Sequence, residues 1–146
     1  MPGRLLNVYV ASPGGGKFLA VMQFKKSVPS DEGRQRQAAL LAFSAFSELK
    51  QVILVDEDVD IFDMNDVMWA MITRMQGDID IINIPGVRCH PLDPSNDPSC
   101  SYTIRDHGIA CKTIFDATVP YSEKKRFQRA KFMDVDPTHW VPNHKG

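Results

Sequence analysis

Apolar residues open the chain in two short runs, LLNVYVA at residues 5–11 and FLAVMQF at residues 18–24, both rich in strand-forming residue types. The SPGGGK segment between them carries three glycines, which tolerate the positive φ angles of a tight turn. The two runs therefore predict neighbouring strands, most simply a hairpin. Residues 31–50 follow with apolar side chains near helical spacing, acidic residues at the beginning and Lys50 at the end, which predicts a helix.

The middle of the chain changes from a strand-like pattern to a helix-like one and back. Residues 51–56 (QVILVD) are almost wholly apolar, which is typical of a strand covered on both faces and indicates a place near the middle of a sheet. The next pattern predicts a helix that is capped by Asp63, buries Val, Met and Ile side chains and ends at Gly77. Residues 79–84 (IDIINI) predict another strand, stopped by the Pro-Gly pair that follows.

The last third of the chain begins with a segment rich in Pro, Ser, Asp and Cys that reaches about Gly108. A loop of this length inside a compact domain is unusual unless it is functional or disordered, so it is the first place to look for a site. Residues 112–118 predict a last strand, residues 122–132 a basic helix, and the polar tail a mobile end. Alternating strands and helices favour a single layered α/β domain over residues 1–146.

Composition narrows the function classes. The chain has 146 residues, 43% of them hydrophobic, which suffices for one domain with a real core. Because 17 basic side chains face 18 acidic ones, we expect no general attraction to nucleic acid or to an anionic membrane. No apolar run approaches the roughly 18 residues of a membrane helix. Three cysteines and the absence of a signal-peptide pattern favour a reducing cytoplasm.

Carboxylates crowd residues 56–66, and calcium is the first hypothesis for them. Asp56, Asp58 and Asp60 match the first three alternating ligands of an EF-hand loop. The match then fails, because the glycine and the glutamate that this loop requires are replaced by Ile61 and Val67.

Two other interpretations of the acidic run remain. A magnesium-dependent phosphoacceptor pocket would need a second acidic group after another strand, and the order of elements does not supply it. The simpler interpretation is structural: carboxylates between a strand and a helix cap backbone amides, which suits Asp63 and Asp66 better than the tight triplet before them.

Two further motifs are weak by themselves. Residues 14–17 (GGGK) resemble part of a phosphate-binding loop, but the full pattern lacks its first glycine and its Ser or Thr, so at most an anion such as a carboxylate is expected beside Lys17. The basic segment KKRFQRAKF allows an RNA-binding surface, although an amphipathic helix is the simpler account.

Cysteine and histidine side chains gather in and around the long loop. They suggest zinc binding or Cys–His nucleophilic catalysis, but without paired C-x-x-C spacing we favour neither, and we expect no metal site in this chain. The residues concerned are Cys89, His90, Cys100, His107 and Cys111.

Taken in order, the acidic strand end with VDEDVDIFDMNDVMWAMITRM, the IPG segment and KTIFDATVPYSEKKRFQRAKF resemble the C-terminal domain of UbiD-type decarboxylases. This family uses prenylated FMN to remove or add carboxylate on aromatic and unsaturated acids. The resemblance spans about residues 5–137. The final stretch is most similar to the branch acting on hydroxylated benzoates such as protocatechuate, gallate, 4-hydroxybenzoate and vanillate.

The resemblance implies a three-layer αβα domain with a mixed central sheet. It also implies that prenylated FMN, a divalent metal and the Glu-Arg-Glu catalytic set belong to an upstream split-barrel domain that this chain lacks, and it leaves potassium open as a further ion. We therefore expect the chain alone to be inactive and to contain no catalytic residue. Its expected partners are the flavin-binding domain and copies of itself, in a homodimer or a higher homo-oligomer. The alternative is a free-standing interaction subunit without catalytic function.

Three side chains are expected at the substrate because of the same resemblance. His90, in the HPL tripeptide with Leu92, matches a ring-bearing residue that packs on the substrate, and its imidazole can both stack and hydrogen-bond to a ring hydroxyl. Lys17 matches a lysine that points toward the phenol oxygen or the carboxylate. We expect His90 to matter more than Lys17. Relatives that bind the flavin phosphate with a lysine before the acidic strand carry it where this chain has Phe43, so that contact is in doubt.

Overall fold

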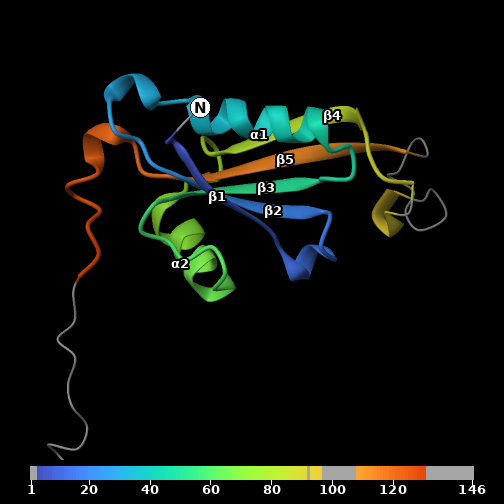
Figure 1. Cartoon of the computed structure of the whole chain (residues 1–146). Helices are drawn as coiled ribbons and strands as arrows, with labels where there is room; N and C mark the ends of the chain where they lie inside the picture. The colour runs from blue at the N-terminus through green and yellow to red at the C-terminus, as the bar shows by residue number, and fades with distance from the viewer. Residues whose placement is uncertain (1–2, 92, 97–107, 131–146) are drawn as a thin grey trace, which may run out of the picture.

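The computed structural model describes residues 3–91, 93–96 and 108–130, which form one five-stranded sheet between two helices (Figure 1). The strands are β1 (Leu5–Val10), β2 (Leu19–Phe24), β3 (Gln51–Asp56), β4 (Ile81–Arg88) and β5 (Ile109–Ala117), and the helices are α1 (Arg34–Ala45) and α2 (Met64–Arg74). The strand order is β1-β2-β3-β5-β4. β2, β3 and β5 run parallel, whereas β1 and β4 are antiparallel to their neighbours. The sheet is therefore mixed, as expected.

Two hydrophobic clusters lie on opposite faces of the sheet, and each is covered by one helix. Along β3, Val52 and Leu54 pack into the cluster under α1, while Ile53 and Val55 pack into the cluster under α2. Successive strand side chains point to opposite faces, so an apolar run such as QVILVD is stable where both faces are covered. The predicted central strand, the hairpin of β1 with β2 and the three-layer αβα arrangement are confirmed (Figure 1).

The helix predicted over residues 31–50 is shorter, because α1 begins at Arg34 and ends at Ala45. Gly33 precedes it with φ 83°, a left-handed conformation that interrupts the helical path. Asp31 belongs instead to a separate 3-10 turn, where its buried carboxylate accepts from the backbone N–H of Ser27 at 2.8 Å and from Arg4 at 2.8 Å. The acidic start of the pattern thus fixes a loop.

The cap predicted for the second helix is confirmed, but its end is not. The Asp63 carboxylate accepts from the backbone N–H of Asn65 at 2.9 Å and opens α2. α2 stops at Arg74, before Gly77, because Met75 takes an extended conformation and the N–H of Gln76 donates to the side chain of Asp80 at 2.8 Å. A side-chain acceptor thus replaces the next helical carbonyl.

The Pro-Gly pair does not stop the strand predicted over residues 79–84. β4 continues through Pro85 and Gly86 to Arg88, and its register with β5 shifts between Ile84 and Val87. Proline cannot donate to a ladder, but it is tolerated here because β4 lies at the edge of the sheet, and Gly86 supplies the positive φ of 71° that the irregularity needs.

The basic helix predicted over residues 122–132 is wrong as far as the structure describes it. Only a 3-10 turn, Tyr121–Glu123, forms, and residues 124–130 continue as turn and irregular chain. Tertiary ion pairs replace the helix: Lys124 binds Glu57 at 2.9 Å and Arg129 binds Asp66 at 2.6 Å. Residues 131–146, including the tail predicted to be mobile, lie outside the described residues.

Candidate functional site

Two of the three side chains expected at the substrate lie at the same end of the sheet. Lys17 lies two residues before β2, and His90 lies two residues after β4, at the end of the sheet where the parallel strands begin. The ring of Phe18 joins them: its centroid is 6.1 Å from that of His90, nearly edge-on at 72°, and 5.6 Å from Nζ of Lys17. Leu92 lies outside the described residues.

His90 is held by a residue that the sequence did not single out. Its Nε2 lies 3.2 Å from Oε1 of Glu48, and its side chain is only 16% exposed. Its carbonyl accepts the backbone N–H of Asp93 at 3.1 Å, which closes a turn just after it. The Lys17 ammonium and the pair of His90 with Glu48 therefore lie around the apolar ring of Phe18. We call this group the Phe18 edge (Lys17, Phe18, Glu48 and His90).

The cysteine hypotheses gain no support from the described residues. Burial, with the negative charge of Asp93, raises the pKa of the Cys89 thiol, which disfavours the thiolate that catalysis or metal binding requires. The Cys89 sulfur lies 3.0 Å from the side-chain amide of Asn96. Within the described ranges no group of three His, Cys, Asp or Glu side chains is placed to hold a metal ion, while Cys100 and His107 lie outside them.

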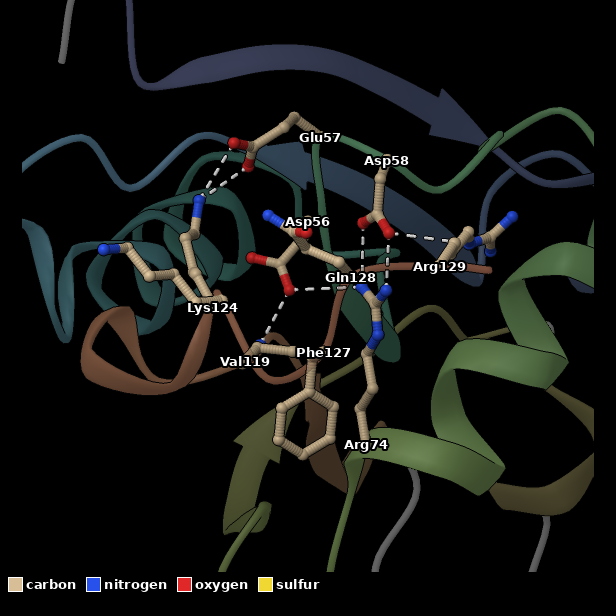
Figure 2. A pocket seen from close by; sticks show the side chains of 10 residues that line it. Asp56, Glu57, Asp58, Arg74, Val119, Lys124, Phe127, Gln128 and Arg129 are labelled. Atoms are coloured by element: carbon tan, nitrogen blue, oxygen red, sulfur yellow. Dashed lines mark hydrogen bonds and ion pairs between the residues drawn. The ribbon is translucent and has the colours of Figure 1, made fainter. Parts of the chain in front are cut away.

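A second candidate region lies at the opposite end of the sheet, where β3 and β5 finish. Here a pocket of about 530 Å³ opens beside the carboxyl ends of two neighbouring parallel strands, a common place for ligands in α/β sheets (Figure 2). It is lined by Asp56, Glu57, Asp58, Arg74, Val119, Lys124, Lys125, Phe127, Gln128 and Arg129. The pocket includes neither Lys17 nor His90.

Asp56 stands at the base of this pocket and is almost fully buried. Its Oδ2 accepts from the backbone N–H of Val119 at 2.7 Å and from Arg74 at 3.3 Å, whereas Oδ1 has no hydrogen-bond partner among the described residues (Figure 2). Burial raises the pKa of Asp56 to about 6, against the opposing effects of the Val119 N–H and of the charges of Lys26 and Arg74.

Arg74 connects the acidic residues of the run. Its side chain is 1% exposed, donates to both oxygens of Asp58 at 2.8 and 2.6 Å, and lies 5.1 Å over the ring of Trp69. Burial alone would raise the pKa of Asp58, but the two hydrogen bonds and the charge of Arg74 lower it. Asp60 points elsewhere and accepts the N–H of Phe62 at 2.9 Å. Asp56 and Asp58 therefore share the guanidinium of Arg74, whereas Asp60 accepts from a backbone amide.

An Asp56→Asn variant is expected to change how stability depends on pH. The folded pKa of about 6 exceeds the ordinary value of 3.8, so Asp56 stabilises the fold fully below pH 3.8 and loses this contribution as pH rises to 6. We expect the unfolding free energy of wild type minus that of the variant to fall by about 3 kcal/mol across this window. Urea unfolding at several pH values measures it. Asp78→Asn, at an exposed position, is the control, and its unfolding free energy should depend on pH as that of the wild type does.

The sequence carries little signal for the residues it missed. Glu48 lies 42 positions from His90, and Arg74 reads as an ordinary basic residue in the last turn of a helix. The pattern around Phe18 predicts only a strand. Their roles depend on which loops the sheet topology brings together.

Comparison with known proteins identifies relatives along most of the chain. A family model described as the 3-octaprenyl-4-hydroxybenzoate carboxy-lyase C-terminal domain matches residues 1–117. A gallate decarboxylase of Lactiplantibacillus plantarum is 57% identical over 136 residues, which are 92% of this chain and 28% of that protein. The chain thus spans less than a third of the length of this relative.

Solved structures agree with this match. The apo 3,4-dihydroxybenzoic acid decarboxylase of Enterobacter cloacae is 63% identical with a TM-score of 0.86, covering 97% of this chain and 29% of that one. A UbiD-class enzyme from Pelotomaculum thermopropionicum, in complex with FMN, is 29% identical with a TM-score of 0.76. The match covers 92% of this chain and 28% of that one. An evolved dimeric form of the latter enzyme, in complex with prenylated FMN, is 25% identical with a TM-score of 0.65. The match covers 92% of this chain and 26% of that one.

Proposed function

This chain belongs to the UbiD C-terminal domain family, and from that premise we propose that it is the substrate-capping and oligomerisation domain of a decarboxylase acting reversibly on hydroxylated benzoic acids. The similar proteins named above are decarboxylases of gallate and of 3,4-dihydroxybenzoic acid, both of them hydroxylated benzoic acids. Because this chain covers 28% and 29% of these two proteins, the proposal assigns the chemical step to the remaining part.

The observation that carries the proposal is the Phe18 edge. A hydroxybenzoate offers a flat ring, an anionic carboxylate and one or more phenol hydroxyls. The Lys17 ammonium suits the carboxylate or a phenolate, the His90 imidazole suits a hydroxyl as donor or acceptor, and the Phe18 ring offers an apolar contact. The edge thus presents three side chains that match three features of one substrate class.

The flavin does not fit the described residues of this chain on their own. The pocket of about 530 Å³ is at the far end of the sheet from Lys17 and His90, and no metal-holding group occurs in the parts of the chain that the structure describes. We therefore place prenylated FMN and its metal in the flavin-binding domain of the complete enzyme. When bound, the flavin supplies an electron sink for decarboxylation. The role left to this chain is to bind and orient the aromatic acid and to exclude water from it.

Self-association is the second part of the proposal. On the outer side of α2, Met68 and Ile72 are one turn apart and are 47% and 77% exposed. Apolar side chains grouped in this way favour a protein partner, and a copy of the same domain is the one we propose.

The cytoplasmic location predicted from the sequence remains part of the proposal. Among the helices that the structure describes, none is long and apolar enough to cross a membrane.

The test is an activity measurement on the complete enzyme. We expect this domain, joined to its flavin-binding domain and supplied with prenylated FMN, to release carbon dioxide from at least one member of a panel of hydroxybenzoates. Benzoate without a ring hydroxyl should react far more slowly, and the 146-residue chain alone should be inactive. A complete, flavin-loaded enzyme that leaves the entire panel unchanged would contradict the substrate assignment.

A further inference from the structure

The loop between α1 and β3 contacts the side chain of His90 and the backbone of Phe18. It comprises residues 46–50 and carries Glu48, whose carboxylate is 3.2 Å from Nε2 of His90. The Glu48 side chain is 33% exposed. A glutamate that is this exposed keeps its position only where the backbone around it is fixed, and the contacts of the loop provide this.

Backbone hydrogen bonds attach the loop to Phe18. The N–H groups of Lys50 and Gln51 both donate to the carbonyl of Phe18, at 2.9 and 2.8 Å. The carbonyl of Lys50 accepts the N–H of Thr113 of β5 at 3.0 Å. The loop that bears Glu48 is therefore continuous with the sheet at the residue whose ring faces His90.

A buried ammonium group holds the other end of the loop. Lys112, on β5, is 3% exposed, and its Nζ donates to the carbonyl of Ser47 at 3.0 Å and to that of Phe43 at 3.4 Å. Burial lowers the pKa of Lys112, since the charged form loses hydration. The carbonyls at the end of α1 compensate for part of this loss, because the carboxyl end of a helix favours positive charge.

The same loop also holds the segment that follows His90. Nζ of Lys50 lies 2.9 Å from Oδ2 of Asp93, whose backbone N–H donates to the His90 carbonyl at 3.1 Å. The ion pair with Lys50 and the hydrogen bonds from Ser95 lower the pKa of Asp93 against the opposing effect of burial. His90 is thus fixed at its side chain by Glu48 and at its backbone through Lys50.

We propose that Glu48 is a positioning residue that orients the imidazole of His90 against Phe18, so that the ring presents a defined nitrogen and a defined plane to the aromatic acid. A carboxylate at Nε2 accepts the N–H of that nitrogen and so fixes how the ring is turned. The role at the substrate rests on the function proposed above. The ring orientation itself is a property of this chain and can be measured without any enzyme activity.

The first experiment is solution NMR on the 146-residue chain. We expect ring-to-ring nuclear Overhauser effects between His90 and Phe18 in the wild type, their loss in Glu48→Ala, and their return in Glu48→Gln, whose amide oxygen still accepts a hydrogen bond. Glu123→Ala is the matched control, because Glu123 is 37% exposed and pairs with Arg126 at 2.9 Å after β5, far from the Phe18 edge. Well-dispersed amide spectra establish that each variant is folded. Unchanged ring contacts in folded Glu48→Ala would overturn the proposal.

The second experiment uses the complete flavin-loaded decarboxylase that contains this domain. We expect Glu48→Ala to lower kcat by about tenfold with a smaller change in KM, because a misoriented ring mainly affects the reacting geometry. The kcat of Glu48→Gln should remain within about threefold of the wild-type value. The kcat of Glu123→Ala should equal the wild-type value. If His90→Ala impairs turnover but Glu48→Ala does not, Glu48 has no positioning role. If His90→Ala has no effect either, the function proposed for the Phe18 edge fails, and the NMR result alone decides whether Glu48 orients the ring.

Discussion

An Arg74→Met variant of the 146-residue chain should lose about 3–5 kcal/mol of unfolding free energy at pH 7, as expected when one partner of a buried ion pair is removed. The Arg74 side chain is 1% exposed and contacts Asp56 and Asp58. Methionine fills similar space but removes one of the positive charges that act on the buried Asp56 carboxylate and leaves those of Lys26 and Lys124. Asp58 is 38% exposed, so water can hydrate it, and most of the loss should come from Asp56. Urea unfolding followed by circular dichroism measures the change.

Two comparisons separate this cause from a general effect of removing an arginine. Arg126→Met is the matched control, since Arg126 is 80% exposed and pairs with Glu123 at the surface. It should stay within about 0.5 kcal/mol of the wild type. The deficit of Arg74→Met should shrink below pH 6, where Asp56 takes up a proton, and adding Asp56→Asn should recover part of it. Equal losses in both arginine variants, or a deficit independent of pH, would contradict the role assigned to the buried pair.

His90→Ala in the complete decarboxylase should lower kcat/KM for a hydroxybenzoate by well over tenfold, on the scale of losing a specific hydrogen bond to a substrate hydroxyl. The imidazole is 16% exposed and is held between Glu48 and the Phe18 ring, so it offers a preformed contact. Lys17→Ala should cost less, because its ammonium lies over the Phe18 ring on the hairpin connection and is replaceable by solvent cations. Steady-state kinetics on both variants provides the measurement.

The substrate itself supplies a control for His90. If the imidazole contacts a ring hydroxyl, removing that hydroxyl from the substrate should reduce the effect of His90→Ala, since the two changes delete the same contact. Parent-like rates for both His90→Ala and Lys17→Ala would remove the Phe18 edge from the substrate site. The amide spectrum of each variant domain checks that the fold is intact.

Local patterns were sufficient for some elements of the fold and insufficient for others. The central position of β3 follows from its apolar run, and the Asp63 cap follows from one side chain and the amides beside it. The length of α1 depends on the left-handed Gly33, and a propensity argument does not register that conformation. The segment after β5 has a helical pattern, but Lys124 and Arg129 gain ion pairs to distant carboxylates instead.

Some residues of the candidate site could likewise be predicted from the sequence, and others could not. Lys17 and His90 came from the resemblance of short motifs to a family, and the structure brings both to one end of the sheet. Glu48 and the ring of Phe18 could not be found in this way, because their contacts depend on the parallel order of β2, β3 and β5. The stretch of residues 55–75 contributed to the family resemblance without revealing that Arg74 joins two of its carboxylates.

The irregular Pro85–Gly86 step also makes the two margins of the sheet unequal. A proline on the outer strand deprives β4 of a donor, which discourages another chain from extending the sheet on that side. The β1 margin has no proline, and Val8 and Val10 are 49% and 41% exposed. Among the described strands, addition of a further strand is therefore disfavoured on the β4 side. Head-to-tail stacking would need β1 of one copy to pair with β4 of the next, so the proline in β4 discourages extension of the sheet into a fibre.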